Sequence, residues 1–226
     1  MPDRPAPSVT RLLAELHAYR LAHMAPEALQ ANIDQRRHLE ETADRAAWVK
    51  PGDVIEPFVL PEVLGGTVDL AELAAAGPVV LLFFRFANCP ACNISLRHYQ
   101  QELYPALAGL GATLVAISPQ VPEKLAAIRN RFGLPFPVAS DSGYRLTRSL
   151  GITFTASAEQ QERDRAKGGG LGAELGTGRW ELPYPTIVVV DRQRVVTLAD
   201  VHPDWLVRTE AETVIDAVSA LVQVPA

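Results

Sequence analysis

The pattern of hydrophobic and polar positions is most distinctive in the middle of the first half of the chain. Residues 79–84 (VVLLFF) form an unbroken apolar, β-rich run, which is the pattern of a central strand covered on both faces. From Cys92 the period becomes helical, with Leu96 and Tyr99 following on the same face. The sequence therefore predicts a buried strand, a short turn, and a helix whose first turn contains Cys89 and Cys92.

Similar patterns recur in the later part of the chain. Apolar β-rich runs predict strands over residues 113–117, 136–139, 186–190 and 195–199, and helical periods predict helices over 123–132, 144–150 and 210–222. The first two central strands need right-handed crossovers and therefore lie parallel. The last two strands are joined by a short turn and should be antiparallel. This order predicts an α/β protein with a thioredoxin-like fold, a central mixed sheet flanked by helices.

The residues before this core predict a helical N-terminal extension over 1–47, followed by one thioredoxin-like domain over 48–226. Ser8 or Thr10 could cap a first helix. Pro26 interrupts it, and a second helix is expected to run to about Trp48. The second helix is rich in charged residues. These form either a solvated face or a surface that packs on a partner subunit, and in the second case the protein would be a homodimer.

Two glycine-containing segments are expected to form a turn and a loop in the domain. The glycine pair at 65–66 predicts a turn between an edge strand over 54–60 and a strand over 67–70, which gives an N-terminal β-hairpin. The stretch 167–178 is rich in glycine, but its glycines follow no strand and lead into no apolar helix. It is therefore interpreted as a mobile insertion rather than a phosphate site. Trp180, at its end, is either a core anchor or a lid over the site.

Composition narrows the class of protein. Hydrophobic residues make up 48% and charged residues 21% of the 226 residues, which is ordinary for a soluble globular protein. The net charge of −5 provides no basic field for nucleic acid. The longest apolar run is far shorter than a membrane span, and the N-terminus has no apolar segment of a secretory signal. We therefore expect a cytoplasmic protein with no nucleic-acid or membrane partner.

The chain contains two cysteines, Cys89 and Cys92, at the predicted strand-to-helix junction. The first turn of a helix carries unpaired N–H groups and the positive end of the dipole, which favour a thiolate. Pro90 suits the first helical position. A redox dithiol is the favoured interpretation, and the alternatives are two small core residues or half of a metal site. Zinc is disfavoured because there is no second cysteine pair and the histidines lack ligand spacing, so no metal or cofactor is expected.

Residues 84–97 (FRFANCPACNISLR) resemble the active-site segment of peroxiredoxin-like proteins in the alkyl hydroperoxide reductase / thiol-specific antioxidant superfamily, in the branch with a Cys-Pro-Xaa-Cys-Asn motif. Further short motifs similar to those of this branch follow at AISPQ (116–120), SDSG (140–143), LPYPT (182–186) and VHPDW (201–205), the last with Arg208 nearby. The resemblance extends over about residues 48–224, and the helical leader is also similar to leaders of that branch. It implies a thiol-dependent oxidoreductase.

The resemblance allows two registers. As a thioredoxin, the chain would use Cys89 as the exposed nucleophile and Cys92 as the buried resolving thiol. As a peroxiredoxin, it would use Cys92 as the peroxidatic cysteine, with Cys89 in place of the usual threonine. Arg85 then replaces the usual proline, while Asn88 and Phe83 replace the tryptophan and the buried acid of thioredoxins. From its place at the helix start, we expect Cys89 to be the acidic cysteine.

Five further positions complete the candidate site or border it. Arg85 could lower a thiol pKa or hold an anionic group, or form a salt bridge at the end of the strand. Pro185 resembles the cis-proline that faces the dithiol in the thioredoxin fold, although it could be a strand-start proline. His98 is expected on the exposed polar face of its helix. Asp204 and Arg208 are expected to cap the last helix rather than to approach the site.

Three hypotheses for function follow. The first is a thiol–disulfide oxidoreductase that uses Cys89, Cys92, Pro185 and Arg85. The second is a thiol peroxidase that reduces hydrogen peroxide or organic hydroperoxides. The third is a non-enzymatic interaction module, which the presence of both cysteines disfavours. The expected partners are a reducing thiol or thioredoxin-type protein as electron donor and a peroxide or disulfide as substrate.

Overall fold

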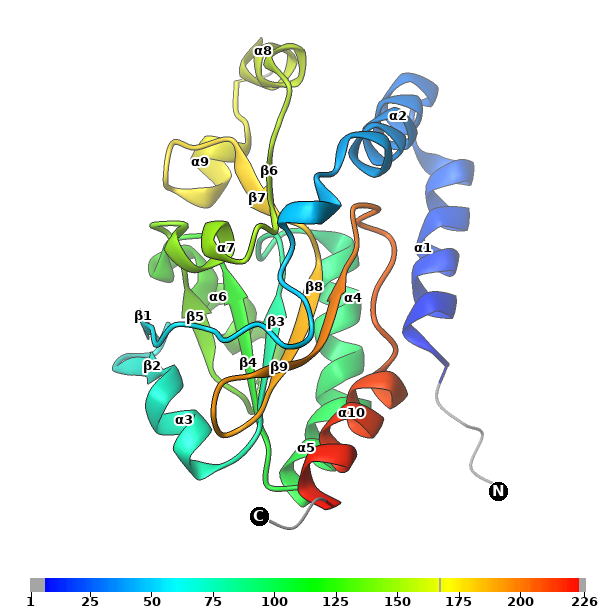
Figure 1. Cartoon of the computed structure of the whole chain (residues 1–226). Helices are drawn as coiled ribbons and strands as arrows, with labels where there is room; N and C mark the ends of the chain where they lie inside the picture. Colours follow the sequence, from blue (N-terminus) through cyan, green and yellow to red (C-terminus); the bar gives the residue numbers. More distant parts are fainter. Residues whose placement is uncertain (1–6, 167, 224–226) are drawn as a thin grey trace.

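The centre of the protein is a five-stranded mixed sheet (Figure 1). The computed structural model describes residues 7–166 and 168–223. The strands follow the order β5-β4-β3-β8-β9, in which β3 and β4 are parallel, β4 and β5 are parallel, and β3, β8 and β9 are antiparallel neighbours. Their bounds are β3 Val79–Phe83, β4 Thr113–Ser118, β5 Val138–Ser140, β8 Thr186–Val190 and β9 Val196–Val201. The predicted thioredoxin-like architecture, with its parallel and antiparallel pairs, is confirmed.

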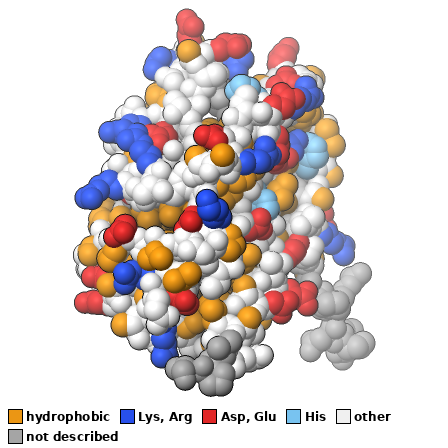
Figure 2. Space-filling view, in the orientation of Figure 1, with side chains coloured by type: hydrophobic (Ala, Val, Ile, Leu, Met, Phe, Trp, Pro, Cys, Tyr) orange, Lys and Arg blue, Asp and Glu red, His pale blue; other side chains and the backbone are white. Residues whose placement is uncertain are grey.

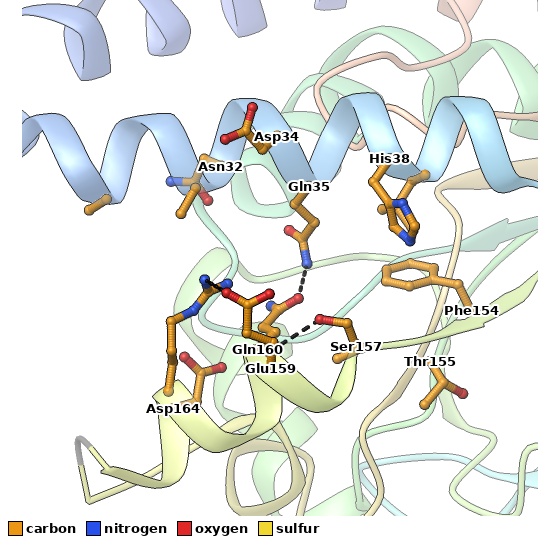
Figure 3. Close-up of a pocket in the computed structure, with 15 residues that line it drawn as sticks. Asn32, Asp34, Gln35, His38, Phe154, Thr155, Ser157, Glu159, Gln160 and Asp164 are labelled. Carbon is orange, nitrogen blue, oxygen red and sulfur yellow. Dashed lines mark hydrogen bonds and ion pairs between the residues drawn. The ribbon is translucent and has the colours of Figure 1, made fainter.

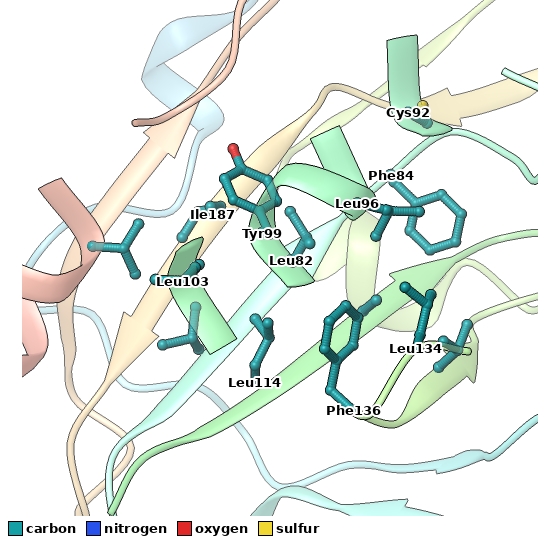
Figure 4. Packing of buried hydrophobic residues seen from close by; sticks show 14 of the residues in the cluster. Leu82, Phe84, Cys92, Leu96, Tyr99, Leu103, Leu114, Leu134, Phe136 and Ile187 are labelled. Atoms are coloured by element: carbon teal, nitrogen blue, oxygen red, sulfur yellow. The ribbon is translucent and has the colours of Figure 1, made fainter. Parts of the chain in front are cut away.

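Helices cover both faces of this sheet, and they explain why β3 is apolar throughout. Val80 and Leu82 face one core together with α4, α5, α6 and α10, while Val79, Leu81 and Phe83 face a second core beneath α3 and α7. Figure 4 shows the first core, where side chains of the sheet meet those of the helix that follows β3. The helix bounds are α3 Leu70–Ala76, α4 Pro90–His98, α5 Tyr104–Gly109, α6 Pro122–Phe132, α7 Arg145–Ser149 and α10 Ala211–Gln223.

The helix after β3 continues as one rod through a π-helical turn, η2 (Tyr99–Leu103), into α5. The widened turn ends two residues before Pro105, which has no N–H to donate to a regular helical bond. Tyr99 begins this turn and is fully buried, and its hydroxyl donates to the carbonyl of Thr209 at 2.7 Å. The rod is thereby tied to the segment between β9 and α10.

The N-terminal extension consists of two helices and a short 3₁₀ turn, α1 (Val9–His23), α2 (Pro26–Thr42) and η1 (Arg45–Ala47). Ser8 caps α1, as expected, by accepting from the N–H of Arg11. The second helix ends earlier than the expected Trp48, because Arg45 donates to the carbonyl of Glu40 and satisfies the last turn there. Helix α1 packs on α4 along one side of the domain (Figure 1). The division of the chain between residues 47 and 48 stays a prediction.

The expected hairpin is present as β1 (Val59–Pro61) and β2 (Thr67–Asp69), although its first strand is shorter than 54–60. The glycine-rich insertion is more ordered than expected. Strands β6 (Thr153–Thr155) and β7 (Glu181–Pro183) pair at its base, and it carries α8 (Ala158–Ala166) and α9 (Leu171–Leu175).

Helix α9 is anchored, because Leu175 is fully buried and its carbonyl accepts from the N–H of Val121. The interpretation of 167–178 as a loop is therefore wrong for α9, while residue 167 lies outside the described residues. Trp180 is neither of the expected alternatives, since it is half-buried against Gly170 with the guanidinium of Arg165 over its ring.

Acidic and basic side chains are interspersed on the face shown in Figure 2. None of the helices within residues 7–166 and 168–223 is both long enough and apolar enough to cross a membrane.

Candidate functional site

The two cysteines lie where β3 gives way to α4, as the sequence predicts. Cys89 is the N-cap residue of α4, and Pro90 occupies the first helical position. Both thiols are free and almost completely buried, with 2% of Cys89 and none of Cys92 exposed. Cys92 lies above Leu96 and Phe84 at the end of the first core (Figure 4). The structure therefore shows the reduced dithiol in a closed site.

The loop that leads into the cysteines is fixed by its neighbours on β4. The N–H of Ala87 donates to the side-chain oxygen of the buried Gln120 at 2.9 Å, and the hydroxyl of Ser118 donates to the carbonyl of Arg85 at 3.1 Å. Ser118 and Gln120 belong to the AISPQ segment, one of the segments that carry the family resemblance. Their contacts fix the loop, because these side chains satisfy backbone groups that have no ladder partner.

The two thiols are joined through the helix N-terminus. The N–H of Cys92 donates to the sulfur of Cys89 at 3.3 Å, so that a cysteine takes the role that serine or aspartate usually plays as a cap. One helical turn separates the residues, which is the spacing at which a disulfide can close within the first turn. Cys89, Cys92 and Arg85 are brought together.

Arg208 lies beside the dithiol. It was expected to cap the last helix, but its guanidinium is buried, with 6% of the residue exposed, and one nitrogen lies 3.7 Å from the sulfur of Cys92. The other terminal nitrogen donates to the carbonyls of Trp205 and Val207. Residue spacing could not reveal this contact across 116 positions, although the conspicuous VHPDW word beside Arg208 was a signal.

The positive charges around the pair place the thiolate on Cys92. Burial by itself would raise the pKa of Cys92, but a side-chain hydrogen bond with the Cys89 thiol and the charge of Arg208 lower it to about 5. Arg85 acts in the same direction through its charge and a backbone hydrogen bond. Burial, together with the neighbouring Cys92, raises the pKa of Cys89 well above its usual value. The expectation that Cys89 is the acidic cysteine is therefore reversed, because the side-chain hydrogen bond with the Cys89 thiol and the charges of Arg208 and Arg85 together favour the thiolate on Cys92.

Arg85 does not form the salt bridge that was its alternative role. Its guanidinium lies 5.1 Å from the ring centre of Trp205 and 5.4 Å from that of Phe86. No carboxylate within residues 7–166 and 168–223 is close enough to pair with it. The arrangement leaves its charge directed at the dithiol.

Two other expectations are corrected. The bond between Tyr184 and Pro185 is trans, as are the other described peptide bonds, so the cis assignment is wrong. The trans form is the more stable one, and the proline starts β8 in an extended path whose carbonyl accepts from His202. Pro185 still lies at the sheet end from which the cysteine loop leaves, because Phe83 pairs with Thr186. His98 is buried rather than exposed.

No other part of the described chain competes as a reactive centre. A polar cleft of about 550 Å³ lies between α2 and α8, and its lining includes Gln35, His38 and Gln160 but neither cysteine (Figure 3). Within residues 7–166 and 168–223, no three His, Cys, Asp or Glu side chains cluster as metal ligands. The dithiol and its arginines are the group with the strongest chemistry.

The chain is similar to known proteins in its sequence and in its fold. The model of the AhpC/TSA family matches residues 51–199. A Mycobacterium tuberculosis protein named "Putative peroxiredoxin Rv2521" is 36% identical over 91 residues, which cover 40% of this chain and 57% of that protein. Thiol-disulfide oxidoreductase ResA of Halalkalibacterium halodurans is 31% identical over 111 residues, which cover 49% of this chain and 61% of ResA. Each match spans less than two thirds of the relative.

Among solved structures, peroxidoxin BcpB from Mycobacterium tuberculosis has a TM-score of 0.60 with 23% identity, over 76% of this chain and 98% of that chain. At that identity the likeness concerns the fold, and it agrees with the thioredoxin-like sheet described above. The portion of this chain that the family model matches contains the cysteines but ends before Arg208.

Proposed function

The chain belongs to the AhpC/TSA family, as a peroxiredoxin-like protein of thioredoxin fold, and on that premise we propose that it is a thiol–disulfide oxidoreductase in which Cys92 is the nucleophile and Cys89 the resolving thiol. The observation that carries the proposal is the contact between Arg208 and the sulfur of Cys92, together with the lowered pKa of that thiol. A thiolate is the form that attacks sulfur, and a guanidinium keeps its charge at every physiological pH.

The reaction proceeds in two balanced steps. The Cys92 thiolate attacks one sulfur of a disulfide substrate, so that a mixed disulfide forms while the substrate's S–S bond breaks and the first thiolate leaves. Cys89 then gives its proton to one departing substrate thiolate, the other being protonated by solvent, and attacks the sulfur of Cys92. The Cys89–Cys92 disulfide forms, and the second substrate thiolate leaves. The protein is oxidised by two electrons and the substrate is reduced to two thiols.

A thiol peroxidase is the second candidate, and a specific observation favours it. The low-pKa thiol stands at the peroxidatic position of the peroxiredoxin register, with an arginine beside it. The thiolate of Cys92 would attack a peroxide O–O bond to give a sulfenic acid and release an alcohol or water. Condensation with the Cys89 thiol would then release water and form the same disulfide.

Stopped-flow kinetics separates these functions. The reduced protein is mixed with hydrogen peroxide, with an organic hydroperoxide and with a neutral disulfide, and its oxidation is followed by tryptophan fluorescence. Rapid oxidation by the disulfide and slow oxidation by both peroxides supports the oxidoreductase, and the reverse order supports the peroxidase. Cys92→Ser is the control that should abolish rapid oxidation by either. No reaction with any of the three would refute both functions.

The electron donor, the location and the oligomeric state are further parts of this proposal. The electron donor would be a reducing thiol or a thioredoxin-type protein, since both reduce disulfides by thiol–disulfide exchange. A cytoplasmic location is proposed from the composition and the two-cysteine content, and a homodimer from the polar leader. Size-exclusion chromatography with light scattering tests the homodimer, and a monomer at micromolar concentration would refute it.

A further inference from the structure

The helical leader, formed by α1 and α2, lies close to the dithiol. Helix α1 packs on α4, and the guanidinium of Arg20, near the end of α1, lies over the ring of Trp205, whose carbonyl accepts from Arg208. Helix α2 reaches the segment between β9 and α10 through Arg36, whose guanidinium pairs with Asp204 at 2.9 Å. Both cysteines are almost completely buried, and they belong to the same hydrophobic cluster as Val9 and Leu13 of α1. A substrate therefore meets leader residues at the dithiol.

These residues form an arginine cluster around one indole ring. The guanidinium carbons of Arg20, Arg36 and Arg85 lie 5.1, 5.7 and 5.1 Å from the ring centre of Trp205. Trp205 is itself 3% exposed, and its carbonyl accepts from Arg208, the residue in contact with Cys92. Three arginines from three separate segments thus surround one tryptophan, whose carbonyl accepts from the arginine that contacts the reactive sulfur. We call Arg20, Arg36 and Arg85 the arginine cluster.

The cluster carries more positive charge than its surroundings neutralise. Within residues 7–166 and 168–223, Asp204 is its one carboxylate partner, and the Cys92 thiolate supplies one more negative charge. Of the bordering carboxylates, Glu40 pairs with Arg45, Asp200 is hydrogen-bonded to His202, and Glu210 accepts from the N–H groups of Val9 and Thr10. Among the described residues, Arg20 and Arg85 therefore have no carboxylate within ion-pair distance.

The hydrogen-bonding capacity of the cluster is also unfilled. The Nη1 atom of Arg20 and the Nε atoms of Arg36 and Arg85 are each buried without a hydrogen-bond partner among the described residues. Burial lowers the pKa of Arg20, and the charges of Arg85 and Arg36 lower it further, so that the guanidinium groups repel one another. Buried donors without acceptors are costly and usually indicate an absent partner. An anion with several oxygen acceptors would satisfy all three.

We propose that the arginine cluster binds the carboxylate of an acidic disulfide substrate while the S–S bond of that substrate is presented to Cys92. Arginine is the side chain best suited to carboxylates, because its planar donors pair with both oxygens. The bound anion would relieve the repulsion between the leader arginines and the domain arginines, and so favour the packing of the leader on the domain. This inference rests on the proposed thiol–disulfide exchange and adds the class of substrate.

The test compares two aromatic disulfides that differ in charge. Dithiobis(nitrobenzoate) carries a carboxylate on each ring, whereas dithiodipyridine is neutral, and both release a coloured product that stopped-flow absorbance follows. The measured quantity is the ratio of the second-order rate constants, anionic over neutral. A change in the reactivity of the thiolate itself affects both rates and largely cancels in this ratio.

The variant is Arg20→Gln, because Arg20 lies in the leader and makes no hydrogen bond to either sulfur. We expect the ratio to fall by about tenfold, the effect of losing a charge-assisted pair. Arg20→Lys keeps the charge and should retain most of the ratio. Arg11→Gln is the matched control, since Arg11 is on the same helix with its side chain 65% exposed, and its ratio should not change.

The outcomes separate this inference from the proposed function. If the folded Arg20→Gln protein keeps the wild-type ratio while both disulfides react, the arginine cluster does not select anions and this inference is wrong. If neither disulfide oxidises the wild-type protein, the proposed exchange itself fails. Arg85→Gln is the second variant in case Arg20→Gln is unstable, and an unchanged ratio there refutes the inference equally.

Discussion

The role of Arg208 is open to a quantitative test, because its charge lies so close to one sulfur. Two unit charges about 4 Å apart interact by about 4 kcal/mol at an effective dielectric constant of about 20, which is equivalent to about 3 pKa units. In Arg208→Met the other arginines remain and water partly replaces the lost charge. We therefore expect the pKa of Cys92 to rise from about 5 to about 7.

The assay isolates one thiol. In a Cys89→Ser background, the thiolate absorbance of Cys92 is titrated with and without Arg208→Met, and the rate of alkylation by iodoacetamide is measured over the same pH range. Arg97→Met is the matched control, since Arg97 lies on α4 with its side chain over Phe132, on the exposed face. The control should leave the titration unchanged.

Two results would refute the reasoning. If Cys92 keeps a pKa of about 5 in folded Arg208→Met, the guanidinium is not the cause of its acidity, and the helix N-terminus or the hydrogen bond from residue 89 must be. If Cys92 already titrates near the ordinary value of about 8.5 before Arg208 is replaced, the thiolate is not on Cys92. Circular dichroism and urea unfolding verify that each variant is folded.

Three further predictions address the pair and its support. The air-oxidised protein should contain a Cys89–Cys92 disulfide by mass spectrometry, and intermolecular links alone would contradict this. Because the thiolate is the reactive form and the pKa of Cys92 is lowered to about 5, the rate with a neutral disulfide should rise with pH through about 5 and level off above about 7, whereas an ordinary cysteine gains rate up to about 9. Tyr99→Phe removes the donor to the buried carbonyl of Thr209 and should cost about 1 kcal/mol in urea unfolding. Tyr19→Phe, at a tyrosine that is 62% exposed, should cost nothing measurable.

Much of the fold follows from local patterns in the sequence. The run at 79–84 predicts a strand covered on both faces, and β3 is indeed buried between two cores. Gly133 ends α6 in a left-handed conformation, as a glycine at a helix C-terminus should. Boundaries set by side-chain hydrogen bonds were less predictable, as the early end of α2 at Thr42 illustrates, because the capping contact of Arg45 has no period in the sequence.

In the candidate site, too, local features could be predicted from the sequence and long-range contacts could not. The position of Cys89 and Cys92 at a helix start is local, and the sequence predicts it. Which thiol is acidic depends on Arg208, which is distant in sequence and close in space. The arginines around Trp205 likewise depend on tertiary packing, which neither periodicity nor composition encodes.

The central claim, that Cys92 attacks and Cys89 resolves, is tested most directly by comparing the two single-cysteine variants with neutral dithiodipyridine at pH 6. The account predicts that Cys89→Ser reacts rapidly, releases one product molecule and keeps a mixed disulfide on Cys92 that mass spectrometry detects. The wild-type protein should release two product molecules and finish with an internal disulfide. Rapid reaction and a stable adduct in Cys92→Ser, with a slow Cys89→Ser, would contradict the account.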